Sequence, residues 1–306
     1  MRVLVTGARG KVGRAAVAAL QRAGHDVVAT DLATAEFDTM PPGTAPYVKA
    51  DLTDAGEVYA LVGGASVGEG PRPGPFEAVV HAGALPAPGR HAPHVVFGNN
   101  LMATFNVVEA CVRWGVRRLV NISSETVPGF IFAERPFLPE YLPVDEAHPV
   151  RPQDPYALAK LFGEQLCDAA AQRSELRCIS IRPTWVQNAQ TYHRNLGPLL
   201  ADRTRPGVTG WSYIDADDLA EAIRLAVEST LPGHEVMYIA AEDTIGSRDL
   251  HESWKAVYPQ SRTELRPVSR PDASGIDTTK ARTLLGWRPT RSWRDHLTKD
   301  GDPLDR

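Results

Sequence analysis

A glycine-rich turn near the start of the chain restricts the possible folds more than any other feature. The apolar run at residues 2–6 leads directly into Gly7, Gly10 and Gly13, and a helical pattern follows at residues 11–23. Glycines at these places allow a tight turn, close approach of the backbone to a bound group, and close packing of helix on strand. The free amides at the start of a helix attract anions. The pattern therefore predicts an α/β fold that binds a dinucleotide.

The alternation of strand-like and helix-like segments supports the same fold class. Apolar β-branched runs alternate with amphipathic stretches up to about residue 180, which predicts parallel βαβ units in a doubly wound sheet. We expect residues 1–180 to form this Rossmann domain. Residues 181–306, with a strand-like run at 236–240, would form a smaller substrate-binding domain whose helix 217–228 packs back on the sheet. The expected strands are 2–6, 26–30, 47–49, 78–81, 118–122 and 177–181, and the expected earlier helices are 11–23, 53–62, 94–114 and 154–173.

Composition and charge exclude several other classes of protein. With 43% apolar residues, 23% charged residues and a net charge of −4, the chain lacks the basic surface on which nucleic-acid binding depends. No apolar run reaches the roughly 20 residues of a membrane helix. No leader-like segment precedes the first strand, so we expect a cytoplasmic protein. Cys111, Cys167 and Cys178 are widely spaced, which predicts buried free thiols rather than a disulfide or metal cluster.

Asp31, at the end of the second expected strand, indicates which dinucleotide binds. A carboxylate there can accept hydrogen bonds from the ribose hydroxyls of NAD, and it repels the 2′-phosphate of NADP. Arg9 in the glycine-rich turn leaves NADP open, because a guanidinium can bind the extra phosphate. A simple turn cap is the other interpretation of Asp31. The expected cofactor contacts also include Lys11, Val12, Leu32, Asp51, Leu52, His81, Ala82 and Gly83.

Tyr156 and Lys160 are the candidate proton-transfer pair. They are four residues apart in a helical segment, so their side chains point the same way. A phenol with a pKa near 10 is a poor base at neutral pH, but a nearby ammonium and an oxidised nicotinamide favour the phenolate. Ser124, after the fifth strand, can hydrogen-bond the same substrate oxygen. Without the preceding dinucleotide-binding unit, the pair would indicate only an ordinary surface helix.

The ordered series of motifs resembles the extended short-chain dehydrogenase/reductase family, within its NAD-dependent epimerase/dehydratase group. The resemblance covers nearly the whole chain, and the order of the motifs is more specific than any one of them. The matching segments are TGARGKVG, DLTD, HAGA, NNLMAT, ISSETVPG, YALAK, IRPT, YIDADDLAEAI and DTTKARTLLGWRP.

The resemblance assigns roles to individual residues. It implies that Ser124, Tyr156 and Lys160 form the catalytic trio and that Asn100 helps to hold the geometry of the active site. It also implies that helices 100–114 and 154–172 form a homodimer interface, with packing inside one monomer as the alternative. The residues that would lie along the cofactor are Asn100, Ile122, Ser123, Tyr156, Lys160 and Pro183, with Lys160 holding the nicotinamide ribose.

Departures from the family pattern bear on the substrate. Nucleotide-sugar epimerases usually carry an Asn and an Arg where this chain has Trp185 and Trp211, so two contacts to a diphosphate are replaced by indoles. The alternative is that another arginine substitutes for them, such as Arg194, Arg203 or Arg205. Either Trp is equally compatible with core packing. Glu125 occupies one of two acidic positions of sugar dehydratases, but Thr126 occupies the other, which disfavours elimination. In uronate dehydrogenases the residue at the position of Glu125 touches substrate hydroxyls, although a carboxylate would repel a sugar acid.

Two interruptions of the pattern and three functional hypotheses remain. Residues 62–75 are typical of a flexible surface loop, and residues 128–153 of a long ordered one that lies between catalytic candidates and can wall the active site.

The first hypothesis is an NAD-dependent dehydrogenase acting on a secondary alcohol of a sugar-like molecule. The second is a sugar epimerase that uses the same oxidation transiently. The third is a cofactor-sensing protein without catalysis, which the retention of both Tyr156 and Lys160 disfavours.

Overall fold

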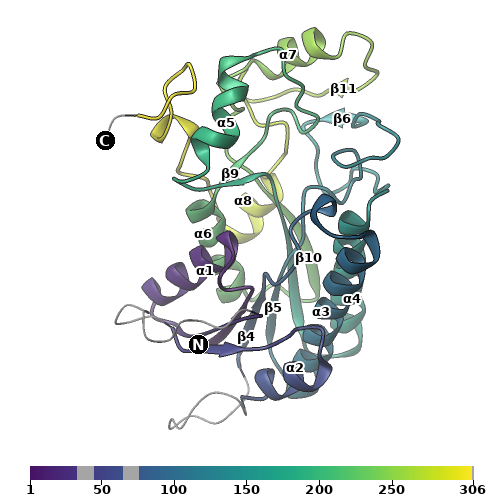
Figure 1. Ribbon diagram of the computed structural model, residues 1–306, viewed down its shortest axis with the longest axis vertical. Coiled ribbons are helices and arrows are strands. Elements are labelled where there is room, and N and C mark those ends of the chain that lie inside the picture. The colour runs from purple at the N-terminus through teal and green to yellow at the C-terminus, as the bar shows by residue number, and fades with distance from the viewer. Residues whose placement is uncertain (33–44, 65–75, 305–306) are drawn as a thin grey trace.

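A seven-stranded parallel sheet forms the centre of the protein (Figure 1). The computed structural model describes residues 1–32, 45–64 and 76–304. The strand order is β10-β7-β5-β4-β1-β2-β3, and every neighbouring pair is parallel, which confirms the predicted doubly wound sheet. The strands are β1 (Arg2–Thr6), β2 (Asp26–Asp31), β3 (Tyr47–Lys49), β4 (Ala78–His81), β5 (Arg118–Ile122), β7 (Arg177–Pro183) and β10 (His234–Ile239).

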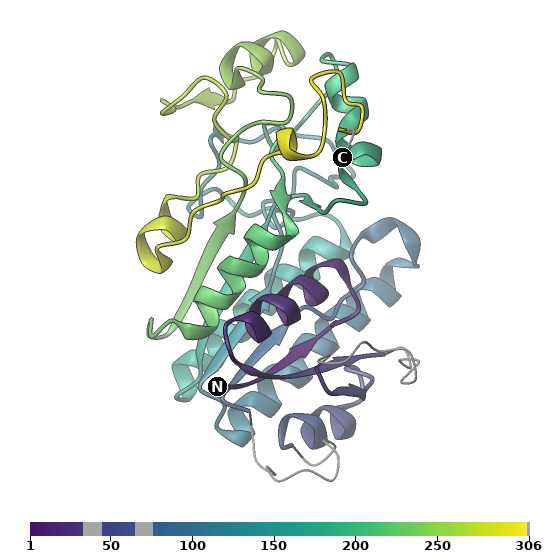
Figure 2. The same cartoon turned by 90° about the vertical axis from the view of Figure 1, so that its left-hand side faces the viewer.

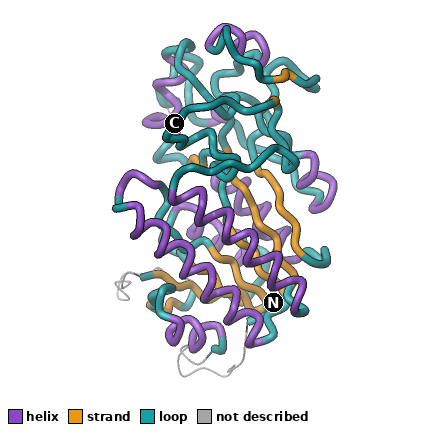
Figure 3. Tube along the Cα trace, turned by 90° about the vertical axis from the view of Figure 1, so that its right-hand side faces the viewer, coloured by secondary structure: helices purple, strands orange, loops and turns teal. Residues whose placement is uncertain are grey.

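Helices cover both faces of this sheet. Helices α1 (Lys11–Arg22) and α6 (Ala216–Glu228) lie side by side on one face (Figure 2). Helices α3 (Pro93–Trp114) and α4 (Pro155–Arg173) run along the other face (Figure 3), where α2 (Ala55–Val62) packs beside α3. An apolar core fills the space on each side of the sheet, because buried strand residues alternate between its two faces.

The second of these cores accounts for two features of the sequence. Cys111, Cys167 and Cys178 all lie in it, buried and free. Helix α3 is, contrary to the expectation from the sequence, apolar and long enough to resemble a membrane span, yet half of that stretch is buried inside the protein. A core helix of a globular fold has the same composition, so its packing explains the apolar sequence of α3.

The strand order reverses at the carboxyl ends of β1 and β4. From β1 the chain first builds outward through β2 and β3, and then crosses to the other side of β1 to form β4, β5, β7 and β10. Ligands of doubly wound sheets bind where the strand order reverses in this way. The glycine-rich turn follows β1 and therefore lies at this edge.

The second half of the chain contributes to both parts of the molecule. Strand β10 forms an edge of the main sheet beside β7, and α6 packs on the sheet as well. The proposed division at residue 180 stays a prediction. The remaining segments, above the sheet in Figure 1, have a core of their own that includes Trp211 and Trp254. They comprise α5 (Tyr192–Ala201), α7 (Leu250–Val257) and the paired short strands β6 (Tyr141–Leu142) and β11 (Glu264–Leu265). Helix α8 (Thr279–Leu285) and the pair β8 (Val186–Gln187) with β9 (Ile214–Asp215) contribute to the core of the main sheet, where α8 packs against α6 and β10.

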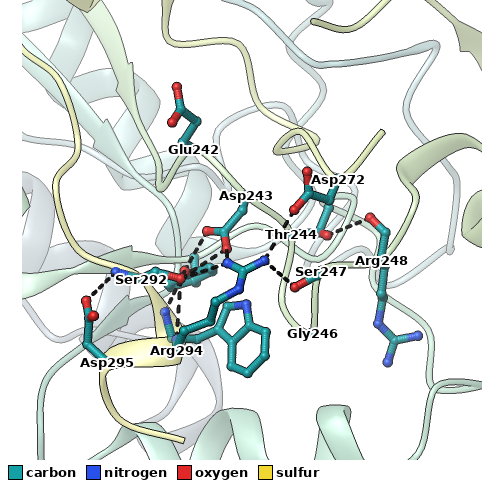
Figure 4. A network of polar contacts seen from close by, with 12 residues as sticks. Glu242, Asp243, Thr244, Gly246, Ser247, Arg248, Asp272, Ser292, Arg294 and Asp295 are labelled. Atoms are coloured by element: carbon teal, nitrogen blue, oxygen red, sulfur yellow. Dashed lines mark hydrogen bonds and ion pairs between the residues drawn. The ribbon is translucent and has the colours of Figure 1, made fainter. Parts of the chain in front are cut away.

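A polar network fixes the C-terminal segment to the loop that follows β10 (Figure 4). Asp243 accepts hydrogen bonds from the hydroxyls of Tyr213 (2.7 Å) and Ser292 (3.1 Å). Arg294 pairs with Asp243 and, at 3.3 Å, with Asp272. Because Asp243 is buried, these partners offset the cost of placing its charge in the protein.

The two predicted loops have different outcomes. Residues 65–75 of the first lie outside the described residues. The second, 128–153, is ordered: its strand β6 pairs with β11, and Val144 forms a bridge with Ile276. The loop is therefore held by the C-terminal part of the chain, which places it beside the carboxyl edge of the sheet.

Candidate active site

Three loops meet around Gly7 and Gly83 at the carboxyl edge of the sheet. Gly7 has φ +63°, and a Cβ on it would lie 2.6 Å from the backbone of Ala82 and Gly83. A Cβ on Gly83 would lie 2.5 Å from Cδ1 of Leu52. Only glycine fits these contacts without displacing a neighbour. The segments after β1, β3 and β4 therefore form one continuous rim.

The start of α1 offers free amides beside this rim. Its N-cap is Gly10, which provides no side-chain cap, and its first turn contains no acidic residue. A Cβ on Gly13 would lie 2.2 Å from the carbonyl oxygen of Gly7, so the helix and the turn pack closely. Unpaired N–H groups with no competing carboxylate form an anion site. These residues fit the diphosphate of a dinucleotide.

The Asp31 carboxylate lies at the end of β2 on the same rim. Its Oδ2 accepts the backbone N–H of Arg9 (2.9 Å), and its Oδ1 accepts that of Leu32 (2.8 Å). Each oxygen retains a lone pair with which it can accept a ribose hydroxyl. Asp51, by contrast, accepts both the N–H and the hydroxyl of Thr53, so its carboxylate shapes the turn after β3.

His81 does not direct its side chain toward the cofactor rim. Burial, and to a smaller extent the charge of Lys160, lower the pKa of His81 to about 3, so the ring is neutral. The hydroxyl of Thr104 donates to the Asn100 carbonyl (2.9 Å) and therefore accepts from Nε2 of His81 (3.1 Å). Nδ1 then accepts from the hydroxyl of Thr6 (2.9 Å). The imidazole therefore connects β1, β4 and α3. Only the backbone of His81 is left to contact a bound cofactor.

Asn100 holds the loop that continues this rim after β4. Its side-chain oxygen accepts the N–H of Leu85 (2.8 Å), and its side-chain nitrogen donates to the Leu85 carbonyl (3.0 Å). The amide thus substitutes for a backbone pairing partner at a place where the sheet has ended. This arrangement supports the positioning role that the resemblance implied.

Helix α4 brings Tyr156 and Lys160 to the end of β5. Oδ1 of Asp154 caps the helix by accepting the N–H groups of Tyr156 and Ala157, both at 2.9 Å, and proline follows the cap. Nζ of Lys160 donates to the carbonyl of Ile122 (2.6 Å) and lies 5.8 Å from the centre of the Tyr156 ring. Ser124 lies close enough to Tyr156 to lower the pKa of its phenol. The three proposed catalytic side chains are therefore brought together, buried, at one edge of the sheet.

Burial sets the proton affinities of this trio. It raises the pKa of Tyr156 to about 12; the nearby Ser124 hydroxyl opposes the rise, and the charges of Asp154 and Glu125 add to it. Burial lowers the pKa of Lys160 to about 8, against the influence of Glu164. At neutral pH the phenol is thus protonated and the ammonium mostly charged. A positive charge placed beside Tyr156 is needed to favour the phenolate.

Residues that the sequence analysis did not select support this arrangement. Glu164, one turn after Lys160, accepts the Ser123 hydroxyl (2.5 Å) and both Nε (2.8 Å) and Nη2 (2.7 Å) of Arg182. The hydroxyl of Ser123 is therefore turned into the protein and not toward the cofactor. The Asp-Pro-Tyr sequence at the start of α4 is a helix-start signal that could have identified Asp154.

The substrate-side candidates have different environments. Glu125 is nine-tenths buried, its Oε2 has no hydrogen-bond partner among the described residues, and burial raises its pKa to about 8. It is therefore mostly neutral at pH 7, which removes the expected repulsion of a sugar acid. Trp185 is 42% exposed, and its backbone lies close enough to the Glu125 carboxyl group to oppose part of the rise of its pKa. Phe132, from the 128–153 loop, packs edge-on against Tyr156 and is an aromatic wall that the sequence analysis missed.

Trp211 is not brought to this site. It is 1% exposed in the core of the C-terminal part, its indole N–H donates to the carbonyl of Arg205 (3.1 Å), and Arg248 lies over its ring. The structure thus supports the core-packing interpretation of Trp211. The reason is that α5, α7 and the C-terminal loops close around it, which sequence spacing alone does not reveal.

The fold and the site together define a Rossmann-type, dinucleotide-dependent enzyme scaffold. A family model described as the NAD-dependent epimerase/dehydratase family matches residues 3–240. The chain therefore belongs to this family, as the motifs predicted, and its cofactor is NAD.

Known relatives include both epimerases and dehydrogenases. A UDP-glucose 4-epimerase of Mycolicibacterium smegmatis is 27% identical and covers 98% of this chain and 97% of its own. A uronate dehydrogenase of Pseudomonas putida is 25% identical over 86% of this chain and 85% of its own. The solved structure of a UDP-glucose 4-epimerase of Thermus thermophilus in complex with NAD has a TM-score of 0.67 and 26% identity, covering 98% of this chain and 96% of that one.

Proposed function

We propose that this protein transfers a hydride between NAD and a secondary alcohol of a sugar or sugar-derived substrate, and releases the altered cofactor after each turnover. The observation that carries this proposal is the buried cluster of Ser124, Tyr156 and Lys160 beside the rim of the dinucleotide site. The relatives named as a UDP-glucose 4-epimerase and a uronate dehydrogenase support a sugar or sugar derivative as the substrate.

The residues of the chain handle the proton and position the reacting oxygen. NAD, when bound, supplies the hydride acceptor, and the positive charge of its oxidised ring adds to that of Lys160. Both charges lower the pKa of Tyr156 from the high value that burial gives it. The phenolate then takes the proton of the substrate hydroxyl, while Ser124 hydrogen-bonds the same oxygen as it becomes a carbonyl. In the reverse direction Tyr156 returns the proton.

The surroundings of this cluster suit a sugar. Exposed aromatic faces at Trp185 and Phe132 provide apolar surface for a sugar ring, and the neutral carboxyl of Glu125 can both donate and accept a hydrogen bond. A neutral acid also accommodates an anionic sugar next to it. These features favour a free sugar or sugar acid over a substrate that is held by its diphosphate.

A second candidate function is sugar epimerisation, which the UDP-glucose 4-epimerase relatives favour. It uses the same residues but returns the hydride to the opposite face of the substrate, so no NADH accumulates. The two functions differ in whether the cofactor is exchanged at each turnover.

The decisive experiment follows the cofactor. We expect NADH to accumulate beyond one equivalent per enzyme when NAD is supplied with free sugars or sugar acids, measured by absorbance at the NADH band. Chromatography of the denatured protein should find little retained nucleotide. Tightly retained NAD, with an epimerised nucleotide sugar and no net NADH, would establish the second candidate instead. Firm NAD binding without turnover of any sugar would contradict both.

We also propose that the outer face of α3 is the contact between two copies of the chain. Val95, Met102 and Phe105 lie on this helix with 40%, 43% and 41% of their surfaces exposed. Their spacing puts them on one side of α3, the helix that packs against α4. Apolar side chains grouped in this way are typical of an interface between subunits.

Phe105→Glu is expected to convert a dimer into a monomer. The new carboxylates would meet at the two-fold contact, where burying an unpaired charge is costly. Size-exclusion chromatography with light scattering measures the change in mass, and Lys255→Ala, at an exposed position of α7 and not on α3, is the control. A wild-type protein that is already monomeric at micromolar concentration would contradict the proposed contact.

A further inference from the structure

The Lys11 side chain connects the cofactor rim to a distant segment of the chain. Lys11 is the first residue of α1, within the glycine-rich turn. Its Nζ donates to the carbonyl of Val186 at 2.6 Å and lies 3.4 Å from the hydroxyl oxygen of Thr191. These partners belong to residues 186–191, which we call the strap. The strap runs from β8 to the start of α5.

The strap is ordered to receive this ammonium. The hydroxyl of Thr191 donates to the carbonyl of Asn188 (3.2 Å) and accepts its N–H (2.9 Å), so its remaining lone pair is available to Lys11. Val186 pairs with Ile214 in the two-stranded β8–β9 sheet. The bond therefore joins two rigid pieces of structure, and its donor is charged, which makes it stronger than a bond between neutral groups.

The same segment continues to the substrate side of the active site. Just before the strap, the carbonyl of Pro183 accepts the N–H of Glu125 (3.2 Å), and the backbone of Trp185 lies close enough to the Glu125 carboxyl group to lower its pKa. One stretch of chain thus links Lys11, at the diphosphate end of the rim, with Glu125, beside the catalytic trio. A change in the position of the strap would therefore alter the surroundings of both Lys11 and Glu125.

The positive charges of Lys11 and Arg194 favour the binding of an anion near the start of α1. Burial and the like charge of Arg194, on α5, both lower the pKa of Lys11, so the ammonium is held at some cost. The bonds described for Lys11 go to a carbonyl and a hydroxyl, and neither compensates its charge fully. The N-terminal amides of α1 lie next to it without an acidic residue in the first turn. A diphosphate bound there would relieve the repulsion between the two cations.

We propose that Lys11 is a clasp that holds the strap closed over the diphosphate of bound NAD, so that the cofactor leaves only when the contact between Lys11 and the strap opens. The inference rests on NAD being the cofactor and does not depend on which sugar reaction follows. It makes Lys11 a positioning residue for the strap as well as a contact of the cofactor. In this arrangement the strength of the clasp sets how long NAD is retained between turnovers.

The test compares NADH release from Lys11→Met, Thr191→Val and the double variant. Release is measured by stopped-flow fluorescence after mixing the NADH complex with excess NAD, without any sugar. We expect Lys11→Met to release NADH about tenfold faster or more, since a hydrogen bond to a charged group is lost. Thr191→Val, which removes the hydroxyl that receives Lys11 and orders the strap through Asn188, should accelerate release about threefold. The two effects should be less than additive, because both variants weaken one contact.

The controls separate a clasp from a simple cofactor contact. Arg22→Met, at the far end of α1, should release NADH at the wild-type rate, and circular dichroism checks that each variant is folded. If Lys11→Met accelerates release but Thr191→Val does not, Lys11 contacts the diphosphate without closing the strap, and the clasp is wrong. Unchanged release from Lys11→Met overturns it too. Since no sugar is present, the absence of sugar turnover would leave these measurements intact.

Discussion

Tyr156→Phe is expected to lower kcat by about 10³-fold or more while the affinity for NAD stays within a few-fold. The phenol is the group that exchanges a proton with the substrate, and phenylalanine keeps its ring and its contact with Phe132. Lys160, which donates to the Ile122 carbonyl, keeps its own position because that bond does not involve Tyr156. The loss should therefore appear in turnover and not in cofactor binding.

Steady-state kinetics with the substrate found by the NADH screen and fluorescence titration with NADH provide the two measurements. Tyr59→Phe, on α2 and away from the catalytic trio, is the matched control and should retain full activity. Near-normal turnover of Tyr156→Phe would show that another group takes the proton. A parallel loss of NADH affinity would instead indicate a damaged cofactor site.

The second large effect is a dependence of stability on pH that originates in Glu125. Burial raises the pKa of Glu125 from 4.5 to about 8 in the folded protein. Between these values the folded chain holds a proton that the unfolded chain has released. The free energy of unfolding that this group contributes is thus present below about pH 4.5 and is lost as the pH rises to about 8. At about 1.4 kcal/mol for each tenfold change in proton affinity, the loss is roughly 5 kcal/mol.

Glu125→Gln should remove most of this decline, because an amide of similar shape does not ionise. Urea unfolding at pH 5 and pH 8 measures it, and we expect the wild type to lose several kcal/mol more than the variant between the two values, by the same linkage. Glu175→Gln, at an exposed position, is the control. The comparison stops at pH 8 because the lowered pKa of Lys160 adds stability as the pH rises from about 8 toward 10.5. Equal slopes for wild type and Glu125→Gln would mean that Glu125 is ionised throughout this range.

Local features of the sequence were sufficient for the fold class and for much of the rim. The strands β1, β3, β4 and β5 match their expected ranges, because short β-branched runs between turns have few alternatives in a parallel sheet. Gly7, Gly13 and Asp31 likewise lie where the turn after β1 and the end of β2 required them. Tyr156 and Lys160 share one face of α4 because four residues span about one helical turn.

Features that depend on distant neighbours were not accessible in this way. The run at 236–240 has no local sign that it pairs with β7 as an edge of the main sheet. His81 and Trp211 were candidates by motif position, yet each is enclosed by segments far away in the sequence, and neither side chain is brought to the site.

The sequence by itself determined a doubly wound sheet, a dinucleotide site and a Tyr-Lys pair, since each follows from the spacing of nearby residues. Tertiary structure alone decided the protonation of Glu125, the aromatic wall at Phe132 and the contact of Lys11 with the strap. The physical reason is that burial and contact between residues far apart in the sequence set desolvation and hydrogen bonding, and these exist only once the chain has closed on itself.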